Sequence, residues 1–252
     1  MEKNYQNQII IDGLEYCNWN RAIFEDLLKG GVTAVHATLV YWENTEESFN
    51  KIEEWNERFF EFKDLICHAK TTDDILQAKK NNKVAILFGF QNSAPIANDI
   101  SLVESFFEKG LRFMQLTYNN QSLLATGCYE NVDSGVTNFG KEVIREMNRV
   151  GIVIDMSHSA EKSTLDAIEL SEKPIAITHA NPFFWHNAKR NKSEALLKNL
   201  SESGGMLGLS LYAHHLKDGS NCKIENFCEM VAKTAELIGV KNIGIGSDLC
   251  LN

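Results

Sequence analysis

Residues 147–158 read MNRVGIVIDMSH, and this stretch contains the pattern that decides the fold. The polar end of a helix is followed by Gly151, by the apolar run Ile152–Ile154, and then by Asp155 and His158. Glycine just after a helix takes the left-handed conformation that ends the helix and lets the chain turn into a strand. The stretch therefore predicts a helix, a tight turn and a strand whose carboxyl end carries an imidazole.

The same order of helix, glycine and strand recurs at residues 27–32, 107–111, 203–207 and 237–240. Repeated β-α units imply parallel strands, because each helix returns the chain to the same edge of the sheet. Eight strands are predicted, at Ile9–Ile11, Thr33–Val40, Val84–Phe88, Phe113–Leu116, Ile152–Ile154, Ile175–Ile177, Met206–Leu211 and Ile243–Ile245.

Helical patterns fill the gaps between these strands, and together they predict a (β/α)8 TIM-type barrel. The predicted helices are Arg21–Lys29, Phe49–Phe62, Asp73–Lys80, Leu102–Lys109, Lys141–Arg149, Glu161–Glu169, Ser193–Ser201 and Ile224–Leu237. An open doubly wound sheet is the alternative, and it is disfavoured because no glycine-rich phosphate turn follows the first strand. With three prolines and no low-complexity linker, we expect residues 1–252 to form a single domain.

The end of the chain departs from a complete barrel. The eighth predicted strand ends at Ile245 and no helical pattern follows it before Asn252. A barrel without its last helix would leave apolar surface exposed on its first and last strands. We therefore expect this sequence to be truncated after the eighth strand, with the last helix missing.

Composition narrows the class of protein. An apolar content of 44% is ordinary for a globular core, and a net charge of -9 argues against nucleic acid or an anionic membrane as the main partner. No run of 18 apolar residues is present, so no segment is predicted to span a bilayer. The six cysteines lack paired metal-ligand spacing, which favours reduced thiols in a cytoplasmic protein. Composition leaves a homodimer open.

Polar side chains at the strand ends form the candidate site. His158, His179 and Asp248 each follow an apolar strand, and carboxyl ends of parallel strands converge on one mouth. Two imidazoles and an oxygen donor can hold zinc with an open position, and a carboxylate on the last strand suits a general base. Arg190 could hold a substrate carboxylate through two parallel hydrogen bonds, although residues 189–192 could equally be a solvated basic patch.

The other histidines carry less weight. We expect His36, inside an apolar strand, to be a core residue and His68 to lie on the surface. At most one of His214 and His215 could reach the barrel mouth, because neighbouring residues of a strand point to opposite faces. His186 lies in a loop whose aromatic residues could wall a pocket.

With these residues placed, the chain resembles the membrane (renal) dipeptidase family of zinc metallopeptidases over nearly its whole length. The matching segments are Ile11–Gly13, Gly110–Phe113, Leu116–Thr117, Ile154–His158, Thr178–Ala180, Arg190–Asn191 and Ile245–Asp248. The resemblance implies a metallo-dependent hydrolase-like barrel with two zinc ions that cleave dipeptides. It also implies that His158 and His179 bind one zinc, that Arg190 binds the substrate carboxylate, and that Asp248 contacts the substrate and transfers protons.

The sequence departs from the family pattern in the other half of the metal site. The family's Asp-Gly-His-x-Asp motif reads Asp12-Gly13-Leu14-Glu15-Tyr16 here, so both ligands of the second zinc are replaced. The bridging glutamate is replaced by Gln91, an uncharged and weak ligand, and the substrate-polarising histidine by Tyr118. The hydroxyl of Tyr118 could still donate to a developing oxyanion. Glu15 alternates with its neighbours, so it is not expected to fill the vacated positions without a shift in register.

These observations favour a divergent dipeptidase-like hydrolase that cleaves a dipeptide or another small carboxylated amide. It would hold one zinc at most, through His158, His179 and Gln91, with Asp248 and Tyr118 catalytic. Arg190, Tyr118, Asn119 and Asp248 would bind the substrate. The alternatives are a catalytically silent barrel that binds a small carboxylated ligand, and an enzyme of another reaction type, such as a lyase or decarboxylase.

Overall fold

The computed structural model describes residues 7–250, and residues 1–6 and 251–252 of the predicted domain lie outside the described part. Its strands are all parallel and belong to one sheet. The strands are β1 (Ile11–Glu15), β2 (Ala34–Val40), β3 (Ile66–His68), β4 (Val84–Phe90), β5 (Leu111–Gln115), β6 (Val153–Asp155), β7 (Ala176–Ile177), β8 (Met206–Leu209) and β9 (Ile243–Ile245).

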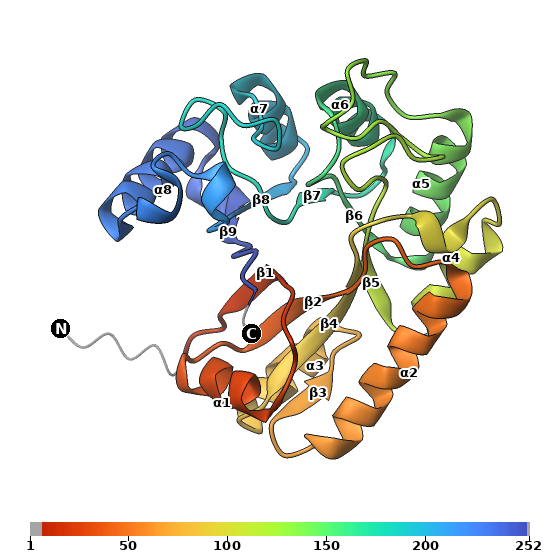
Figure 1. Ribbon diagram of the computed structural model, residues 1–252, viewed down its shortest axis with the longest axis vertical. Coiled ribbons are helices and arrows are strands. Elements are labelled where there is room, and N and C mark those ends of the chain that lie inside the picture. Colours follow the sequence, from red (N-terminus) through yellow and green to blue (C-terminus); the bar gives the residue numbers. More distant parts are fainter. Residues whose placement is uncertain (1–6, 251–252) are drawn as a thin grey trace.

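The sheet closes into a barrel, as the sequence predicted. The strand order runs from β2 through β1, β9, β8, β7, β6 and β5 to β4, and an additional pairing of β4 with β2 completes the ring. Each predicted strand corresponds to one strand of this ring. The short strand β3 was missed, and it pairs only with residues 84–86 of β4, outside the ring. In Figure 1 the strands surround the middle of the molecule and the helices lie outside them.

The eight predicted helices are all present. They are α1 (Arg21–Lys29), α2 (Thr45–Glu61), α3 (Thr72–Lys80), α4 (Ser101–Glu108), α5 (Asn138–Val150), α6 (Glu161–Leu170), α7 (Glu194–Glu202) and α8 (Ile224–Ile238). The prediction that a glycine ends the helix is confirmed for α5, where Gly151 has a φ of 100° in the left-handed region. At the start of α7 the Ser193 side chain accepts a hydrogen bond from the Leu196 N–H, which caps the helix.

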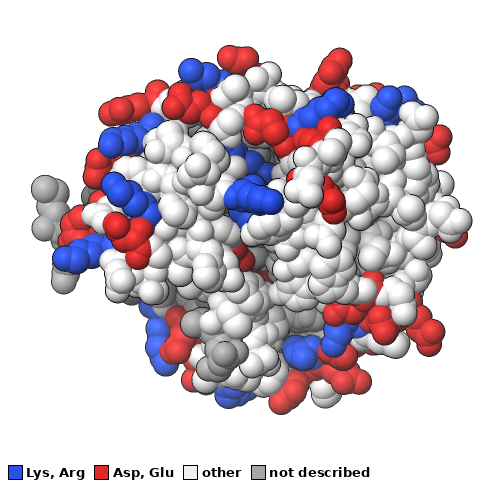
Figure 2. Space-filling view, turned by 45° about the horizontal axis from the view of Figure 1, so that its top comes forward, with Lys and Arg blue, Asp and Glu red and all other residues white. Residues whose placement is uncertain are grey.

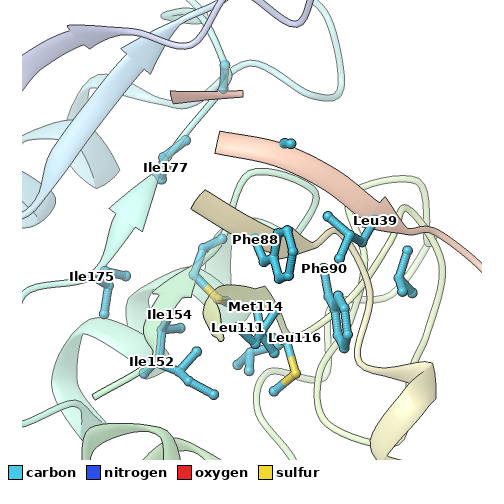
Figure 3. Close-up of a cluster of buried hydrophobic side chains, with 14 of the residues drawn as sticks. Leu39, Phe88, Phe90, Leu111, Met114, Leu116, Ile152, Ile154, Ile175 and Ile177 are labelled. Atoms are coloured by element: carbon cyan, nitrogen blue, oxygen red, sulfur yellow. The ribbon is translucent and has the colours of Figure 1, made fainter. Parts of the chain in front are cut away.

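The main core lies between the strands and the surrounding helices. Figure 3 shows Phe88 and Phe90 of β4 beside Met114 of β5 and Leu116 just beyond it, with Ile154 of β6 nearby, all of them buried. Burying such side chains contributes about 1.5–3 kcal/mol each, which offsets much of the entropy lost when the short strands become ordered. The ring of strands is therefore held from outside by helix packing.

The prediction that His36 is a core residue is confirmed, and the prediction that His68 lies on the surface is wrong. His36 is buried in the barrel, where its Nδ1 lies 2.6 Å from the Gly13 carbonyl oxygen and its ring stacks on Phe113. His68 belongs to the missed strand β3, and its half-buried ring stacks on Phe59 with a centroid distance of 5.1 Å and lies tilted against Phe88 at 4.1 Å.

The barrel closes between β1 and β9, with one paired position, Asp12 opposite Ile245. The Asp12 Oδ1 also accepts a hydrogen bond of 2.8 Å from the Ser247 N–H, which ties the two strands together beyond the ladder. On the outside of this region, Ile11, Met206 and Ile245 are 44%, 48% and 42% exposed. Apolar surface at the first and last strands was expected from the sequence.

In the view of Figure 2, acidic and basic side chains are interspersed and lie mainly towards the edge of the molecule, and some basic side chains also lie near the middle. Among the residues that the structure describes, no helix has the length and apolar character needed to cross a membrane.

A register shift in β1 brings two carboxyl groups together inside the protein. The strand pairs with β2 at Asp12 opposite Val35 and at Glu15 opposite Ala37, so β1 carries one extra residue between these positions. Asp12 and Glu15 are 9% and 3% exposed and share a hydrogen bond. Burial, with the charge of Asp12 as a second cause, raises the pKa of Glu15 to about 8.

This pair predicts that the protein loses stability as the pH rises. A carboxyl group with a raised pKa binds its proton more tightly in the folded state, so its contribution is complete below the unfolded value of 4.5 and is lost towards about pH 8. Glu15→Gln should therefore flatten the pH dependence of the free energy of unfolding and raise that free energy at pH 8 by on the order of 3 kcal/mol. Urea denaturation between pH 5 and 8 measures both effects.

The matched control is Glu57→Gln on the exposed face of α2, which should leave the pH dependence of the parent unchanged. A Glu15→Gln protein with the same pH dependence as the parent would show that the buried pair does not titrate in this range.

Candidate active site

A cavity of about 440 Å³ lies at the carboxyl ends of the barrel strands. Its walls include six of the seven predicted site residues, which are Gln91, Tyr118, Asn119, His158, Arg190 and Asp248. The seventh, His179, is fully buried and contacts His158. The expectation that these strand ends meet at one mouth is therefore confirmed. The other residues that line the cavity are Tyr16, Tyr41, Tyr129, Tyr212 and His215.

The buried Asp155 carboxylate, at the end of β6, organises the strand ends that carry the two histidines. Its Oδ1 accepts hydrogen bonds from the Ser157 N–H, the Ser157 hydroxyl and the Thr178 N–H. Its Oδ2 accepts a hydrogen bond of 2.6 Å from the Thr178 hydroxyl. The Ser157 oxygen in turn accepts from the His179 N–H. One carboxylate thus fixes the backbone directly before both imidazoles.

These contacts also set the tautomer of each imidazole. The Thr178 hydroxyl donates to Asp155, so its oxygen accepts the proton on the His179 Nδ1, which lies 2.8 Å away. The His158 Nδ1 lies 2.7 Å from the Asn119 Oδ1, which can only accept, so this Nδ1 also carries its proton. Each ring therefore presents an unprotonated Nε2 on its other side.

The two Nε2 atoms face each other at a distance of 3.0 Å. Burial, reinforced by the positive charge of Arg190, lowers the pKa of both imidazoles well below the ordinary value, so both rings are neutral. Two opposed lone pairs at this distance repel unless a cation lies between them. Two nitrogen ligands of a tetrahedral zinc stand about 3.3 Å apart, so His158 and His179 fit one metal ion with little adjustment.

The positions that would complete a second metal site do not offer anionic ligands. Leu14 is fully buried and Tyr16 lines the cavity wall. The Gln91 Nε2 donates a hydrogen bond of 2.9 Å to the Thr38 hydroxyl, which leaves only the amide oxygen for a metal. The Glu43 carboxylate accepts from the N–H groups of its own loop. Within residues 7–250, no group of three or more His, Cys, Asp or Glu residues could hold a metal ion.

Arg190 is 2% exposed, so it does not belong to a solvated basic patch. Its Nη1 donates to the Ser157 carbonyl and its Nη2 donates to the His179 carbonyl at 3.1 Å. Among the described residues, no carboxylate lies within ion-pair distance of the guanidinium. A buried cation on a cavity wall is costly without a counter-charge, so the site is suited to an anionic ligand.

Asp248 follows β9 and has a φ of 58° in the left-handed region, which is uncommon for a non-glycine residue. A hydrogen bond of 3.0 Å from its N–H to the Leu14 carbonyl holds this conformation. Burial raises the pKa of Asp248 to about 7, although the charge of Arg190 opposes this shift. A carboxyl group with a pKa near neutrality can both accept and return a proton.

Tyr118 and Asn119 follow β5 and lie against the His158 side chain. The Tyr118 ring stacks on the His158 ring with a centroid distance of 4.3 Å, and burial raises the pKa of its hydroxyl. The hydroxyl therefore keeps its proton and can donate it in a hydrogen bond. Asn119 uses its Oδ1 to orient His158, a role in the metal half of the site that the sequence did not suggest.

His215 is a wall residue that the predicted site omitted. It is 5% exposed, and its carbonyl accepts hydrogen bonds from the buried amides of Asn181 and Asn191. Of the pair His214 and His215, only this one lines the cavity, which agrees with the limit set from the sequence. It lies in a short 3-10 helix, Ala213–His215, beyond the end of β8, so strand periodicity could not have chosen between the two.

Comparison with known proteins identifies the family to which this chain belongs. Residues 20–250 match the sequence model described as membrane dipeptidase (peptidase family M19). Dipeptidase tcpJ from Claviceps purpurea is 26% identical over 190 residues, which cover 74% of this chain and 45% of that protein. The chain spans about half the length of the curated relatives it matches.

Solved structures show the same fold. A crystal structure described as an amidohydrolase from Pseudomonas aeruginosa superposes with a TM-score of 0.96 at 38% identity, covering 98% of this chain and 75% of that one. A Rhodobacter sphaeroides metallopeptidase, liganded with a phosphinate mimic of the dipeptide L-Ala-D-Ala, gives a TM-score of 0.84 at 17% identity, with 96% of this chain and 86% of that chain covered. Because the family model matches residues 20–250, the chain belongs to the membrane dipeptidase family.

Proposed function

We propose that this chain is a metal-dependent hydrolase of small amides that carry a free carboxylate, such as dipeptides, and that it binds one metal ion at most. The observation that carries the proposal is the 3.0 Å approach of the His158 and His179 Nε2 atoms, with both Nδ1 protons already engaged. Membership of a metallopeptidase family supports hydrolysis, and the identity of the substrate is part of the proposal.

The metal would be held by His158 and His179, with the Gln91 amide oxygen as a weak third ligand, and zinc is the ion that such a donor set suits. When bound, it supplies positive charge that polarises the scissile carbonyl and acidifies water. The chain's own residues bind and orient the substrate around it. The guanidinium of Arg190 binds the substrate carboxylate and thereby fixes the position of the amide bond in the cavity.

Asp248 would transfer the proton. With a pKa raised to about 7, its carboxylate accepts a proton from the attacking water and returns it to the leaving nitrogen. Tyr118 would donate its hydroxyl hydrogen bond to the oxygen that becomes negative during attack, as the family's histidine would. Asn119 lines the same wall and would contact the substrate through its amide nitrogen.

Other predictions from the sequence remain proposals. The cytoplasm is supported by the six cysteines, whose spacing in the sequence favours reduced thiols. The remaining proposals are a small-molecule substrate rather than nucleic acid or membrane, a homodimer, and a single domain over residues 1–252.

Arg190→Ala should remove discrimination in favour of a free carboxylate. The parent should prefer the dipeptide Ala-Ala over its carboxyl-terminal amide in kcat/KM, and the variant should lose about 1.5–3 kcal/mol of that preference, the value of a charge-assisted hydrogen bond. Arg190→Lys should restore only part of it because lysine lacks the planar fork. Lys189→Ala, at an exposed neighbour, is the control. Equal loss on both substrates would contradict the role.

The metal count tests the proposal itself. After dialysis against a mild chelator, elemental analysis should find no more than one tightly bound zinc per chain, because two divalent ions about 3.5–4 Å apart need bridging negative charge. His158→Ala should lose this metal. The combined change Leu14→His, Tyr16→Asp and Gln91→Glu should raise the count towards two, if the fold accepts a polar first strand. Two zinc ions in the parent protein would contradict the proposal.

A further inference from the structure

Four aromatic side chains form a continuous wall on one side of the cavity. Tyr16 follows β1, Tyr41 and Trp42 follow β2, and Tyr118 follows β5. Their rings meet edge to face, with centroid distances of 6.3 Å for Tyr16 and Tyr41, 5.7 Å for Tyr41 and Tyr118, and 5.2 Å for Trp42 and Tyr118. We call these four residues the aromatic wall.

The wall continues beyond the main cavity. Tyr41, Trp42 and Tyr118 also line a second, more open cavity of about 530 Å³, whose other lining residues are Glu43, Glu47 and Lys51. The carboxylates of Glu43 and Glu47 already accept hydrogen bonds from backbone N–H groups of the same loop. Trp42 is 62% exposed and contacts the Tyr118 ring edge to face, so the wall presents apolar surface in this second cavity. A ligand that begins at Arg190 can therefore extend over the wall, where flat apolar groups gain both burial and ring contacts.

The cavity offers little to a positively charged group. Among the residues that line the main cavity, the carboxyl group is that of Asp248 and the guanidinium is that of Arg190. Burial raises the pKa of Tyr16 to about 12, so this part of the wall is uncharged. The positive charge of Arg190 is neutralised by the carboxylate of the substrate. In the main cavity the free ammonium group of a dipeptide would have only Asp248, which the proposed mechanism requires for proton transfer.

We propose that the substrate is an N-acylated amino acid, with its carboxylate on Arg190 and an aromatic acyl group on the aromatic wall, rather than a zwitterionic dipeptide. This inference rests on the proposed hydrolysis and narrows its substrate class. Water would add to the acyl carbon, the carbon–nitrogen bond would break, and the proton from water would pass to the nitrogen. The products are an aromatic carboxylic acid and a free amino acid.

Four glycine derivatives allow the effect of the aromatic ring on binding to be measured separately from the effect of the ammonium group. Phe-Gly has both, N-(3-phenylpropanoyl)glycine has only the ring, Ala-Gly has only the ammonium group, and N-propanoylglycine has neither. Isothermal titration calorimetry with the metal-loaded protein measures binding, and glycine release is followed separately. N-(3-phenylpropanoyl)glycine should bind about tenfold or more tightly than N-propanoylglycine, because a ring is buried, and about tenfold more tightly than Phe-Gly, because no ammonium group is desolvated.

Trp42→Ala should reduce the advantage of the ring at least severalfold and leave the affinity for N-propanoylglycine unchanged. Phe60→Ala removes an aromatic side chain that is 78% exposed on α2 and lines neither cavity, so it should change nothing. Tighter binding of the two dipeptides than of their acyl counterparts would overturn the inference, as would no gain from the ring or no binding of any compound. Selective binding of N-(3-phenylpropanoyl)glycine without glycine release would keep the inference and refute the proposed hydrolysis.

Discussion

The geometry of the site depends on the Asp155 carboxylate. It is fully buried and accepts two backbone and two hydroxyl hydrogen bonds from Ser157 and Thr178. Through Thr178 it fixes the proton on the His179 Nδ1, and through Ser157 it holds the His179 backbone. Since Arg190 donates to the carbonyls of Ser157 and His179, the carboxylate-binding cation is anchored to the same two strand ends. The proposed metal site and the proposed anion site thus share one internal support.

Much of the fold and of the candidate site could be predicted from the sequence. Strand ends in a barrel converge for geometric reasons, so the positions of His158 and Asp248 followed from the helix–glycine–strand pattern alone. The patterns did not reveal β3, because Ile66-Cys67-His68 is not the apolar run that marked the predicted strands and because this strand lies outside the ring. They also could not reveal the extra residue in β1, which depends on pairing with β2 and places Glu15 beside Asp12. Nor could His215 be chosen, because its place is set by long-range hydrogen bonds from Asn181 and Asn191.

The two sides of the barrel mouth have different chemistry. The ends of β6 and β7 present the imidazoles of His158 and His179, which we propose as metal ligands, together with the side chains that orient them. The ends of β1, β2 and β5 instead present Tyr16, Tyr41 and Tyr118, whose hydroxyls stay protonated because burial raises their pKa. Tyr16 stands where the resemblance implies an aspartate ligand, so one charge that a second cation would need is absent. The phenol rings also add an apolar surface that a ligand can cover. The proposed reduction of the metal site and the aromatic wall therefore coincide on this side of the mouth.

X-ray absorption spectroscopy of the zinc-loaded protein at the zinc edge tests the central claim most directly, that a single ion lies between the His158 and His179 Nε2 atoms. This account predicts a first coordination sphere with two imidazole nitrogens at about 2.0–2.1 Å, completed by light-atom ligands. It predicts no scattering from a second metal. A metal–metal vector at about 3.5–4 Å, or a coordination sphere without the imidazole signature, would contradict it.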